Sequence, residues 1–538
     1  MIFFQFYSIM ILLIGIALII ILDYFNINRY HAYIALLALI GSFLITTLFI
    51  VSGSSPEFFG LNGSNLTYTN SLLVFDQFTA FFAVLFTGVI ILIVLASITD
   101  LENVDRSNHF VYYVLMLFVT IGMILVSSAV DLAALVVSWE LVSIPSYLLV
   151  GFVKRDKTTS EAAIKYFIIG SLSSALMLFG ASFLYGISGS TNFYAIMNAV
   201  TSLNGKQATN ITPIIIVGLI LVIAGLGFKM GIVPFHWWLP DAYEGSMTSV
   251  TAMLAAASKK VGFAAGFRVI MIPLIIYGAT WNKYNANAQE ALYTVLLLLA
   301  IATMIVGNVA ALSQTRMKRL LAYSSIGQAG YILLALASGY LPASGGVSSI
   351  GLVAGLFHSF SHAIMTVGAF ICVIAITKVI KSDEIEDYRG LRKLMPKTSF
   401  ALGIILLGLA GIPPLIGFFS KFFIFFAAID AGNGTTNLTI SNLFYLGAFI
   451  GIITSAISVY YYVRVIKLMW VDTSDKEPAP GEIRKLPWNV NLPVFVSFVI
   501  ILAISAAAGP LVSYLYWIVG KVLDPVNYAT ILQLVHIL

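Results

Sequence analysis

The chain has 538 residues, of which 60% are apolar and only 9% are charged, against roughly a quarter charged in ordinary soluble domains. This composition excludes a water-soluble globular enzyme, a disordered chain and a nucleic-acid-binding protein. The net charge of +5 does not indicate an anionic partner, because the basic residues are spread thinly. The single cysteine, Cys372, lies in an apolar run and by itself builds neither an intramolecular disulfide nor a thiolate metal site. The composition predicts a polytopic α-helical membrane protein.

Fourteen apolar segments are long enough to cross a bilayer, which takes about 20 residues in a helix. The runs are continuous rather than alternating, which favours helices over the strands of a membrane barrel. The first run lacks a clear signal-peptide pattern, so we interpret it as a retained span. The predicted spans lie near residues 2–22, 32–51, 78–98, 110–128, 131–152, 162–187, 211–233, 246–270, 290–312, 321–340, 349–377, 398–429, 442–466 and 490–519.

The loops between these spans carry an uneven charge. Most of the 28 basic residues fall in the odd-numbered loops, whereas the even-numbered loops and the C-terminal tail hold only Lys206, Lys283 and Lys521. Because cytoplasmic loops are enriched in lysine and arginine, the bias predicts that both termini lie on the outer side.

Several charged residues fall inside predicted spans, where a charge costs several kcal/mol. Lys165 and Arg268 lie near span ends, and we expect structural roles for both. Glu140, in SWELVSIPSYLLVGF, is the acidic residue at mid-span. It is either protonated or paired with a cation, and the alternative role is a hydrogen bond in helix packing. The other basic residues in spans are Lys229, Lys259, Lys260 and Lys421.

Two of these lysines accompany helix breaks. Lys229 lies in GLGFKMGIVPFHWWLPD and Lys421 in GIPPLIGFFSKFFIFF. Glycine and proline in such segments mark kinked or unwound helices that face water or protein. For Lys229, the alternative is a side chain that reaches to the cytoplasmic surface. Paired breaks indicate inverted repeats, which predicts four regions: 1–109 with three helices, 110–276 and 277–470 with five each, and 471–538 with a cytoplasmic loop, the last helix and a short tail.

Two further pairs complete the set. Lys259 and Lys260 are adjacent, about 100° apart around a helix, so we expect one of them to face the interior. His358 and His362 are four residues apart and share one helix face. An imidazole pair can relay protons near neutral pH, although a packing pair or a metal site is also consistent with this spacing.

Glu140, Lys229, Lys259, His358, His362 and Lys421 therefore form a series of titratable groups in successive helices. Burial disfavours the charged form of both glutamate and lysine, so a pair such as Glu140 with Lys229 can change between an ion pair and a neutral pair at small cost. This arrangement predicts proton transfer. The sequence contains no nucleotide-binding loop, haem motif or cysteine cluster, so we expect no cofactor in this chain and any redox chemistry on other chains.

Long segments resemble the antiporter-like membrane subunits of respiratory complex I, NADH-quinone oxidoreductase. They are SWELVSIPSYLLVGFVKRD, SEAAIKYFIIGSLSSALMLFGASFLYG, GFKMGIVPFHWWLPDAYEG, RMKRLLAYSSIGQAGYILLAL and PPLIGFFSKFFIF, in order over roughly residues 70 to 470. PDAYEG, the pair ending at Lys259 and GFFSKFF are most similar to subunit N, called subunit 2 in mitochondria. Subunit M would place a glutamate at position 421, and subunit L would add a long lateral helix.

This resemblance implies a fourteen-helix core with two inverted five-helix repeats. It also implies a proton channel through Glu140, Lys229, Lys259 and Lys421, driven by quinone reduction in neighbouring subunits that carry flavin, iron–sulfur clusters and quinone. The expected partners are other membrane subunits, lipid and protons, in the cytoplasmic membrane of a prokaryote.

The histidine pair departs from this pattern. His358 and His362 look more like subunits L and M, or like multisubunit sodium/proton antiporters. The alternative functions are therefore a subunit of such an antiporter, without electron transfer, and a structural scaffold that has lost transport. The intact set Glu140, Lys229, Lys259 and Lys421 argues against the scaffold.

Overall fold

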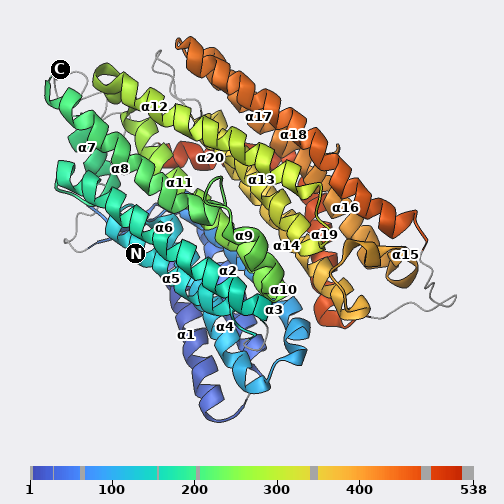
Figure 1. The fold of residues 1–538 in the computed structure, drawn as a ribbon. Helices are drawn as coiled ribbons and strands as arrows, with labels where there is room; N and C mark the ends of the chain where they lie inside the picture. Colours follow the sequence, from blue (N-terminus) through green and yellow to red (C-terminus); the bar gives the residue numbers. More distant parts are fainter. Residues whose placement is uncertain are drawn as a thin grey trace.

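The computed structural model describes residues 4–27, 29–60, 67–68, 70–153, 157–201, 206–339, 349–473 and 486–523. The fold is almost entirely helical, and its helices pack side by side (Figure 1). Two short strands, β1 (Glu57–Phe59) and β2 (Leu73–Phe75), pair antiparallel before the third long helix. The predicted all-α membrane class is confirmed.

Thirteen helices in the described ranges are long and apolar enough to cross a membrane. They are α1 (Phe4–Tyr24), α2 (His31–Ser52), α3 (Gln77–Asp100), α4 (His109–Ser128), α5 (Leu132–Val150), α6 (Lys157–Ser188), α8 (Lys206–Met230), α12 (Ile272–Ala311), α13 (Met317–Ala337), α14 (Ile350–Ile380), α17 (Ile416–Gly434), α18 (Leu438–Trp470) and α19 (Trp488–Ala506). Shorter helices are α7 (Phe193–Thr201), α9 (Trp238–Gly245), α10 (Thr248–Met253), α11 (Lys259–Gly266), α15 (Leu391–Leu394), α16 (Pro396–Ala410) and α20 (Ala508–Leu523).

Three predicted spans are interrupted. The span at 246–270 consists of α10, a π-helical turn at Leu254–Ser258, α11 and a second π-helical turn at Phe267–Met271. The span at 398–429 is divided into α16 and α17, and the last span into α19 and α20. The segment between the predicted spans 246–270 and 290–312 is helical, as the first part of α12. The count of fourteen crossings therefore stays a prediction.

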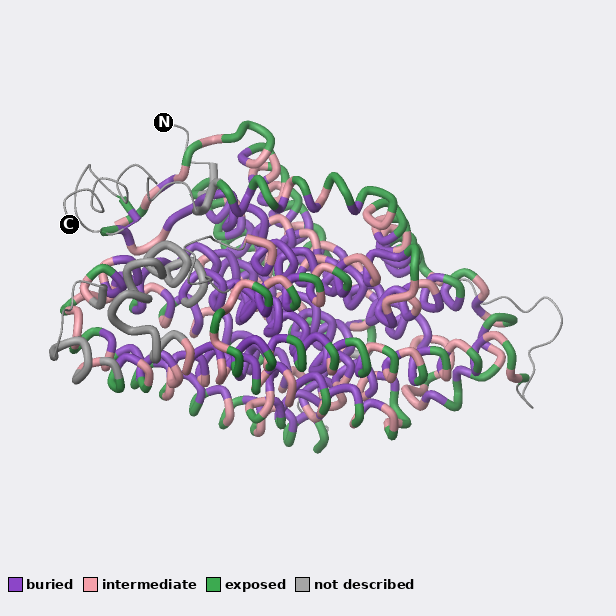
Figure 2. Tube along the Cα trace, turned by 90° about the horizontal axis from the view of Figure 1, so that it is seen from above, coloured by how far each residue is buried: buried purple, intermediate pink, exposed green. Residues whose placement is uncertain are grey.

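Apolar side chains cover the outside as well as the interior. Leu37, Val137 and Phe449 are each at least 60% exposed, and Figure 2 shows the buried residues gathered inside a rim of exposed ones. A soluble protein rarely exposes so much contiguous apolar surface, whereas lipid tails accommodate it. Among the spans, α13 and α14 are the most deeply enclosed. Polar groups on these two helices are therefore far from the lipid.

The two helix breaks begin in the same way. Gly231 follows the end of α8 with φ of +63°, and Gly411 follows the end of α16 with φ of +87°. A left-handed residue directly after a helix favours glycine, because a side chain is strained there. Pro234 and Pro413 follow within three residues and cannot continue a helix. Both breaks therefore leave helix ends inside the bundle, where polar partners must satisfy them.

Candidate functional site

The predicted site residues lie along the interior of the bundle. Lys229, Lys259, Lys260 and Lys421 are each at most 3% exposed, and His358 and His362 at most 1%. Glu140, on α5, is half-buried. Because buried ionisable groups are costly in a membrane, their presence needs a functional or structural reason.

Lys229 occupies the last turn of α8, just before the first break. Its ammonium lies 3.5 Å from the hydroxyl of Tyr166 on α6, at the limit of a hydrogen bond. The rings of Trp139, Tyr166 and Phe228 surround it, with centroids 5.6 to 5.8 Å from Nζ. Aromatic faces attract a cation but do not fix its direction. Lys229 is thus held weakly on three sides.

Glu140 and Lys229 do not form an ion pair in this arrangement. The hydroxyl of Ser174, on α6, donates to Oε1 of Glu140 over 2.5 Å. Within the described ranges, no carboxylate oxygen lies within 4.0 Å of the Lys229 ammonium. In this structure the predicted pair is therefore not in direct contact.

Lys259 lies on α11, directly against the first break. Its ammonium donates to the backbone oxygen of Ser325 over 2.6 Å and to the Ser325 hydroxyl over 2.8 Å. A Cβ atom added to Gly231 would lie 3.0 Å from the Lys259 Nζ. Glycine at position 231 thus leaves room for the Lys259 side chain. Through its bonds to Ser325, Lys259 connects the first helix break to α13.

Lys260 faces a different neighbour. Its ammonium is 2.5 Å from Nδ1 of His362, on α14. The Nε2 atom of His362 is 3.2 Å from the Thr366 hydroxyl, and the ring stacks near that of His358 with centroids 6.2 Å apart. Of the two adjacent lysines, Lys260 is therefore the one that contacts the histidine pair. The sequence alone could not decide between them.

His358 links α14 to two further helices. Its Nδ1 is 2.9 Å from the Ser420 hydroxyl on α17, and its Nε2 is 2.9 Å from Oε1 of Gln328 on α13. The Gln328 amide nitrogen donates to the backbone oxygen of Leu409, at the end of α16. With the Gln328 oxygen as acceptor, Nε2 of His358 is assigned as protonated.

Lys421 binds the open end of the second broken helix. Its ammonium donates to the backbone oxygens of Leu409 and Ala410 and to the Ser455 hydroxyl, each over 3.0 Å. These carbonyls end α16, where a cation is favoured by the helix dipole and by the unpaired oxygens. The Tyr331 ring lies 5.2 Å away. Lys421 and Gln328 share the Leu409 oxygen, which continues the polar line from His358.

A cavity of about 460 Å³ adjoins Lys421. Lys421 and Ser455 supply its polar groups, and aromatic side chains of α17, among them Phe418, Phe422 and Phe425, form much of its wall. Phe422 and Phe426, which both line it, are about half exposed, so the cavity opens to the apolar outer surface. The ammonium of Lys421 therefore lies beside an apolar opening to the outer surface.

The sequence did not identify the polar partners of these residues. Tyr166, Ser325, Gln328 and Ser420 each contact a titratable side chain, and Gln328 links His358 to the Leu409 oxygen that Lys421 also binds. The one available signal was Gln328, an amide in a span that is otherwise rich in apolar and small residues. In the described part of the chain, no group of three or more metal-ligating side chains lies together.

The two charged residues for which we expected structural roles form ion pairs. Arg268 binds Asp76 with both nitrogens, over 2.6 and 2.7 Å. Lys165 binds Glu161 over 2.6 Å and Asp241 over 2.7 Å.

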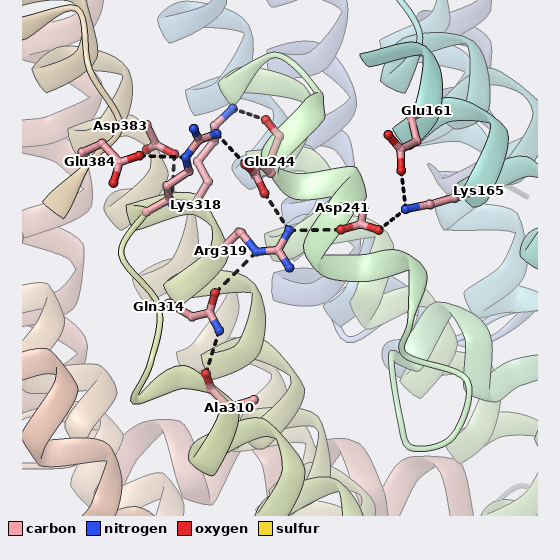
Figure 3. A network of polar contacts seen from close by, with 11 residues as sticks. Glu161, Lys165, Asp241, Glu244, Ala310, Gln314, Lys318, Arg319, Asp383 and Glu384 are labelled. Atoms are coloured by element: carbon pink, nitrogen blue, oxygen red, sulfur yellow. Dashed lines mark hydrogen bonds and ion pairs between the residues drawn. The ribbon is translucent and has the colours of Figure 1, made fainter. Parts of the chain in front are cut away.

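Asp241 belongs to a larger network at one end of the bundle (Figure 3). Arg319 contacts Asp241 over 3.0 Å and Glu244 over 2.6 Å, and Arg316 contacts Glu244 over 2.5 Å and Glu384 over 2.9 Å. This network ties α6 and α9 to the start of α13 and to the segment after α14.

Comparison with known proteins identifies the family. Residues 129–450 match the family described as NADH:quinone oxidoreductase/Mrp antiporter, transmembrane. The chain is 39% identical to F(420)H(2) dehydrogenase subunit N of Methanosarcina mazei over 82% of this chain and 84% of that protein. It is 36% identical to NADH-quinone oxidoreductase subunit N of Heliobacterium modesticaldum over 90% of this chain and 91% of that protein.

Solved structures agree with this assignment. A chain of respiratory complex I from Thermus thermophilus superposes with a TM-score of 0.71 at 28% identity, covering 94% of this chain and 98% of that one. A chain of the Mrp complex from Dietzia superposes with a TM-score of 0.81 at 20% identity, covering 98% and 99%, and shares the fold. The resemblance predicted from the sequence, with subunit N as the most similar member, is confirmed. The chain belongs to the NADH:quinone oxidoreductase/Mrp antiporter transmembrane family.

Proposed function

We propose that this chain is a proton-translocating membrane subunit of a redox-driven complex, and that protons move along the interior line from Glu140 to Lys421. The observation that supports the proposal is the series of contacts in the second part of this line. From Lys260 through His362, His358 and Gln328 to Lys421, neighbouring polar groups are in hydrogen-bond or ring contact. None of these side chains is neutralised by a carboxylate within the described ranges.

The contact between Lys260 and His362 suits direct proton transfer. The charged ammonium donates to Nδ1, and movement of that proton leaves a neutral amine and an imidazolium. The step from Lys260 to His362 moves one proton between groups that are already in hydrogen-bond contact. The rings of His362 and His358 are stacked with centroids 6.2 Å apart, which is not a hydrogen bond, so the step between the two imidazoles takes an intervening water.

The weakly held Lys229 suits the other end of the line. Movement of Glu140 toward Lys229 would stabilise its ammonium, and separation of the two would favour release of the proton, because a lone charge is costly at this depth. Lys259, whose Nζ would lie 3.0 Å from a Cβ added to Gly231, is the next acceptor. The same side chains thus act as donors or acceptors according to the position of Glu140.

The redox chemistry belongs on other subunits. The relatives named above are subunits of F(420)H(2) dehydrogenase and of NADH-quinone oxidoreductase, and one cysteine in this chain cannot hold an iron–sulfur cluster. We infer that flavin, clusters and quinone lie elsewhere in the assembly, and that this chain contributes no electron-transfer centre. Its partners are then other membrane subunits of a prokaryotic cytoplasmic membrane, together with the surrounding lipid.

The inverted repeat belongs to the same proposal. Regions 110–276 and 277–470 each contain one break with glycine at its start and proline after it, and each break is beside a buried lysine. Five helices per region would invert the second relative to the first, with both chain termini on the outer side. The alike breaks support this assignment.

The test uses the assembled complex in proteoliposomes. Lys260→Met should lower the number of protons pumped per electron at least about tenfold, while quinone reduction persists. Unchanged pumping by the assembled Lys260→Met complex would overturn the relay. A sodium/proton antiporter subunit, the alternative, predicts proton movement that follows an imposed sodium gradient without any electron donor.

A further inference from the structure

The helix that carries Lys259 and Lys260 is irregular on both sides of the lysines. A π-helical turn at Leu254–Ser258 precedes α11, and another at Phe267–Met271 follows it. Such turns are rare, often occur at functional sites, and are a cause of helix bending. The helix by itself therefore does not fix the direction in which the two lysines point.

The side chains on the surface of this helix also do little to fix its orientation. Its segment LAAASKKVGFAAGF consists largely of alanine and glycine. Small side chains allow close approach, as where a Cβ at Gly262 would lie 2.8 Å from the Met230 nitrogen. Because small side chains interdigitate little with the side chains of neighbouring helices, packing resists rotation of this helix about its axis only weakly.

The contacts of both lysines nevertheless require one particular orientation of the helix about its own axis. Lys259 binds Ser325 on α13, whereas Lys260 contacts His362 on α14. Because adjacent residues lie about 100° apart, a rotation that improves one contact weakens the other. Something outside the helix must set its register.

Arg268 anchors the helix at one end. In the second π-helical turn, Arg268 forms its two-point ion pair with Asp76, the residue that caps the start of α3. Its Nε donates to the Ser127 backbone oxygen over 3.1 Å and its Nη2 to the Thr79 hydroxyl over 2.8 Å. A two-point pair fixes direction as well as distance.

Asp100 anchors the other end. Its Oδ2 accepts a hydrogen bond of 2.8 Å from the backbone nitrogen of Ser249, at the start of α10. Asp100 is the last residue of α3. The two anchors are thus the two ends of one helix.

The lengths of the two helices agree with this arrangement. The 24 residues of α3 rise about 36 Å. From Ser249 to Arg268 a helical backbone rises about 29 Å, and the long side chain of Arg268 spans the rest. An uninterrupted helix therefore lies alongside an interrupted one and holds both of its ends.

We propose that Asp76 and Asp100 are positioning residues, which through α3 hold the helix from Thr248 to Met271 in the register that directs Lys259 to Ser325 and Lys260 to His362. This inference rests on the proposed proton function. It adds a role for two acids that touch none of the titratable side chains of the relay.

The experiment compares variants of Asp100 in the assembled, reconstituted complex. Asp100→Ala should lower protons pumped per electron about fivefold, the shift expected from the loss of one cap-type hydrogen bond, with quinone reduction unchanged. Asp100→Asn should restore pumping, because the carboxamide oxygen still accepts the Ser249 N–H. Failure of asparagine to rescue would instead indicate that the carboxylate itself titrates, and would overturn the positioning role.

Glu102→Ala is the matched control. Glu102 lies two residues further on, and its carboxylate pairs with Lys378 rather than with the interrupted helix. Its loss should leave pumping unchanged, and an equal loss in both variants would contradict the proposal. If Asp100→Ala fails to assemble, Arg268→Lys is the second test. It keeps the charge but not the two-point contact, and it should also lower pumping.

A combined variant separates this inference from the proton function. If the register acts through Lys260, Asp100→Ala with Lys260→Met should pump no worse than Lys260→Met alone. Hydrogen exchange should also rise in residues 254–262 of Asp100→Ala. Normal pumping by Lys260→Met would contradict the proposed proton function itself. If Lys260→Met stops pumping but Asp100→Ala pumps normally, only the positioning role is contradicted.

Discussion

Two regions of this molecule treat charge in opposite ways. In the network of Figure 3, Arg316, Arg319 and Lys165 each contact two carboxylates. In the interior line, Lys229, Lys259, Lys260 and Lys421 contact carbonyls, hydroxyls, rings and an imidazole. Charge that joins helices is paired with carboxylates, whereas the lysines of the line have no carboxylate partner in the part of the chain that the structure describes.

Arg268 makes the distinction sharper. It is as deeply buried as the lysines, yet it is bound on two points by Asp76. A guanidinium does not release its proton in proteins, whereas an ammonium does. Of these buried bases, the one that cannot take part in proton transfer is the one that is neutralised by an acid.

The largest expected effect follows from breaking the interior line at Lys229. Lys229→Met should lower protons pumped per electron at least about tenfold. It should not destabilise the protein, because the change removes an ammonium that has no carboxylate partner in the described ranges. Pumping is measured in proteoliposomes, and stability is measured as the temperature of unfolding in detergent.

Glu244→Gln is the control from the other region. It removes a carboxylate that contacts both Arg316 and Arg319, so it should cost about 1–2 kcal/mol of stability and leave pumping per electron unchanged. If Glu244→Gln abolished pumping in an assembled complex, the division between the two regions would be wrong.

A second prediction concerns the pH dependence of the network. Burial raises the pKa of Asp383 from 3.8 to about 6, against the opposing effect of Lys318 and Arg316. A raised pKa means that the folded state favours the protonated acid. This contribution to stability is complete below about pH 4 and is lost as the pH rises through 6, by at most about 3 kcal/mol.

Asp383→Asn removes that titration. The unfolding temperature of the variant should therefore fall less than that of the parent between roughly pH 4 and 7. Groups that lie far from Asp383 titrate equally in both proteins, so the difference between the two curves reports on Asp383 and its immediate neighbours. Parallel curves would show that Asp383 is not buried in the way the structure indicates.

The sequence predicted the class of fold and candidate residues of the line, because both depend on local composition. The candidates that it named were Glu140, Lys229, Lys259, His358, His362 and Lys421. It left the part of Lys260 open and did not point to Gln328 as a partner. Apolar runs of sufficient length locate the helices, and a lysine beside glycine and proline indicates a break. The partners were out of reach, since they come from distant segments. Nothing near Lys260 in the chain points to His362, and the separation of Glu140 from Lys229 depends on Ser174 and on three aromatic rings.

The π-helical turns were missed for a related reason. The span at 246–270 has the composition of a continuous helix, and its two irregular turns are identified from the backbone hydrogen bonds of the folded chain. The anchors of that helix, Asp76 and Asp100, likewise lie far from it in the sequence.

The smallest expected effect concerns the contacts that hold the Lys229 ammonium in the interior. Tyr166→Phe removes the hydroxyl near Lys229 but keeps the ring, which also packs on Phe228 and Trp238. Ser146 loses the same hydroxyl but keeps its bond to the Ser143 oxygen. Pumping per electron should fall only about two- to fivefold, because a 3.5 Å hydrogen bond is weak and the aromatic attraction remains.

Tyr166→Leu is the comparison for that variant, because it removes the ring as well as the hydroxyl. It should lower pumping further, since one of the three faces around the ammonium is lost. If Tyr166→Phe stopped pumping as completely as Lys229→Met, the phenol would itself be a member of the proton line. The interior would then hold its lysine by a hydrogen bond that acts in transfer, and the aromatic rings would serve packing alone.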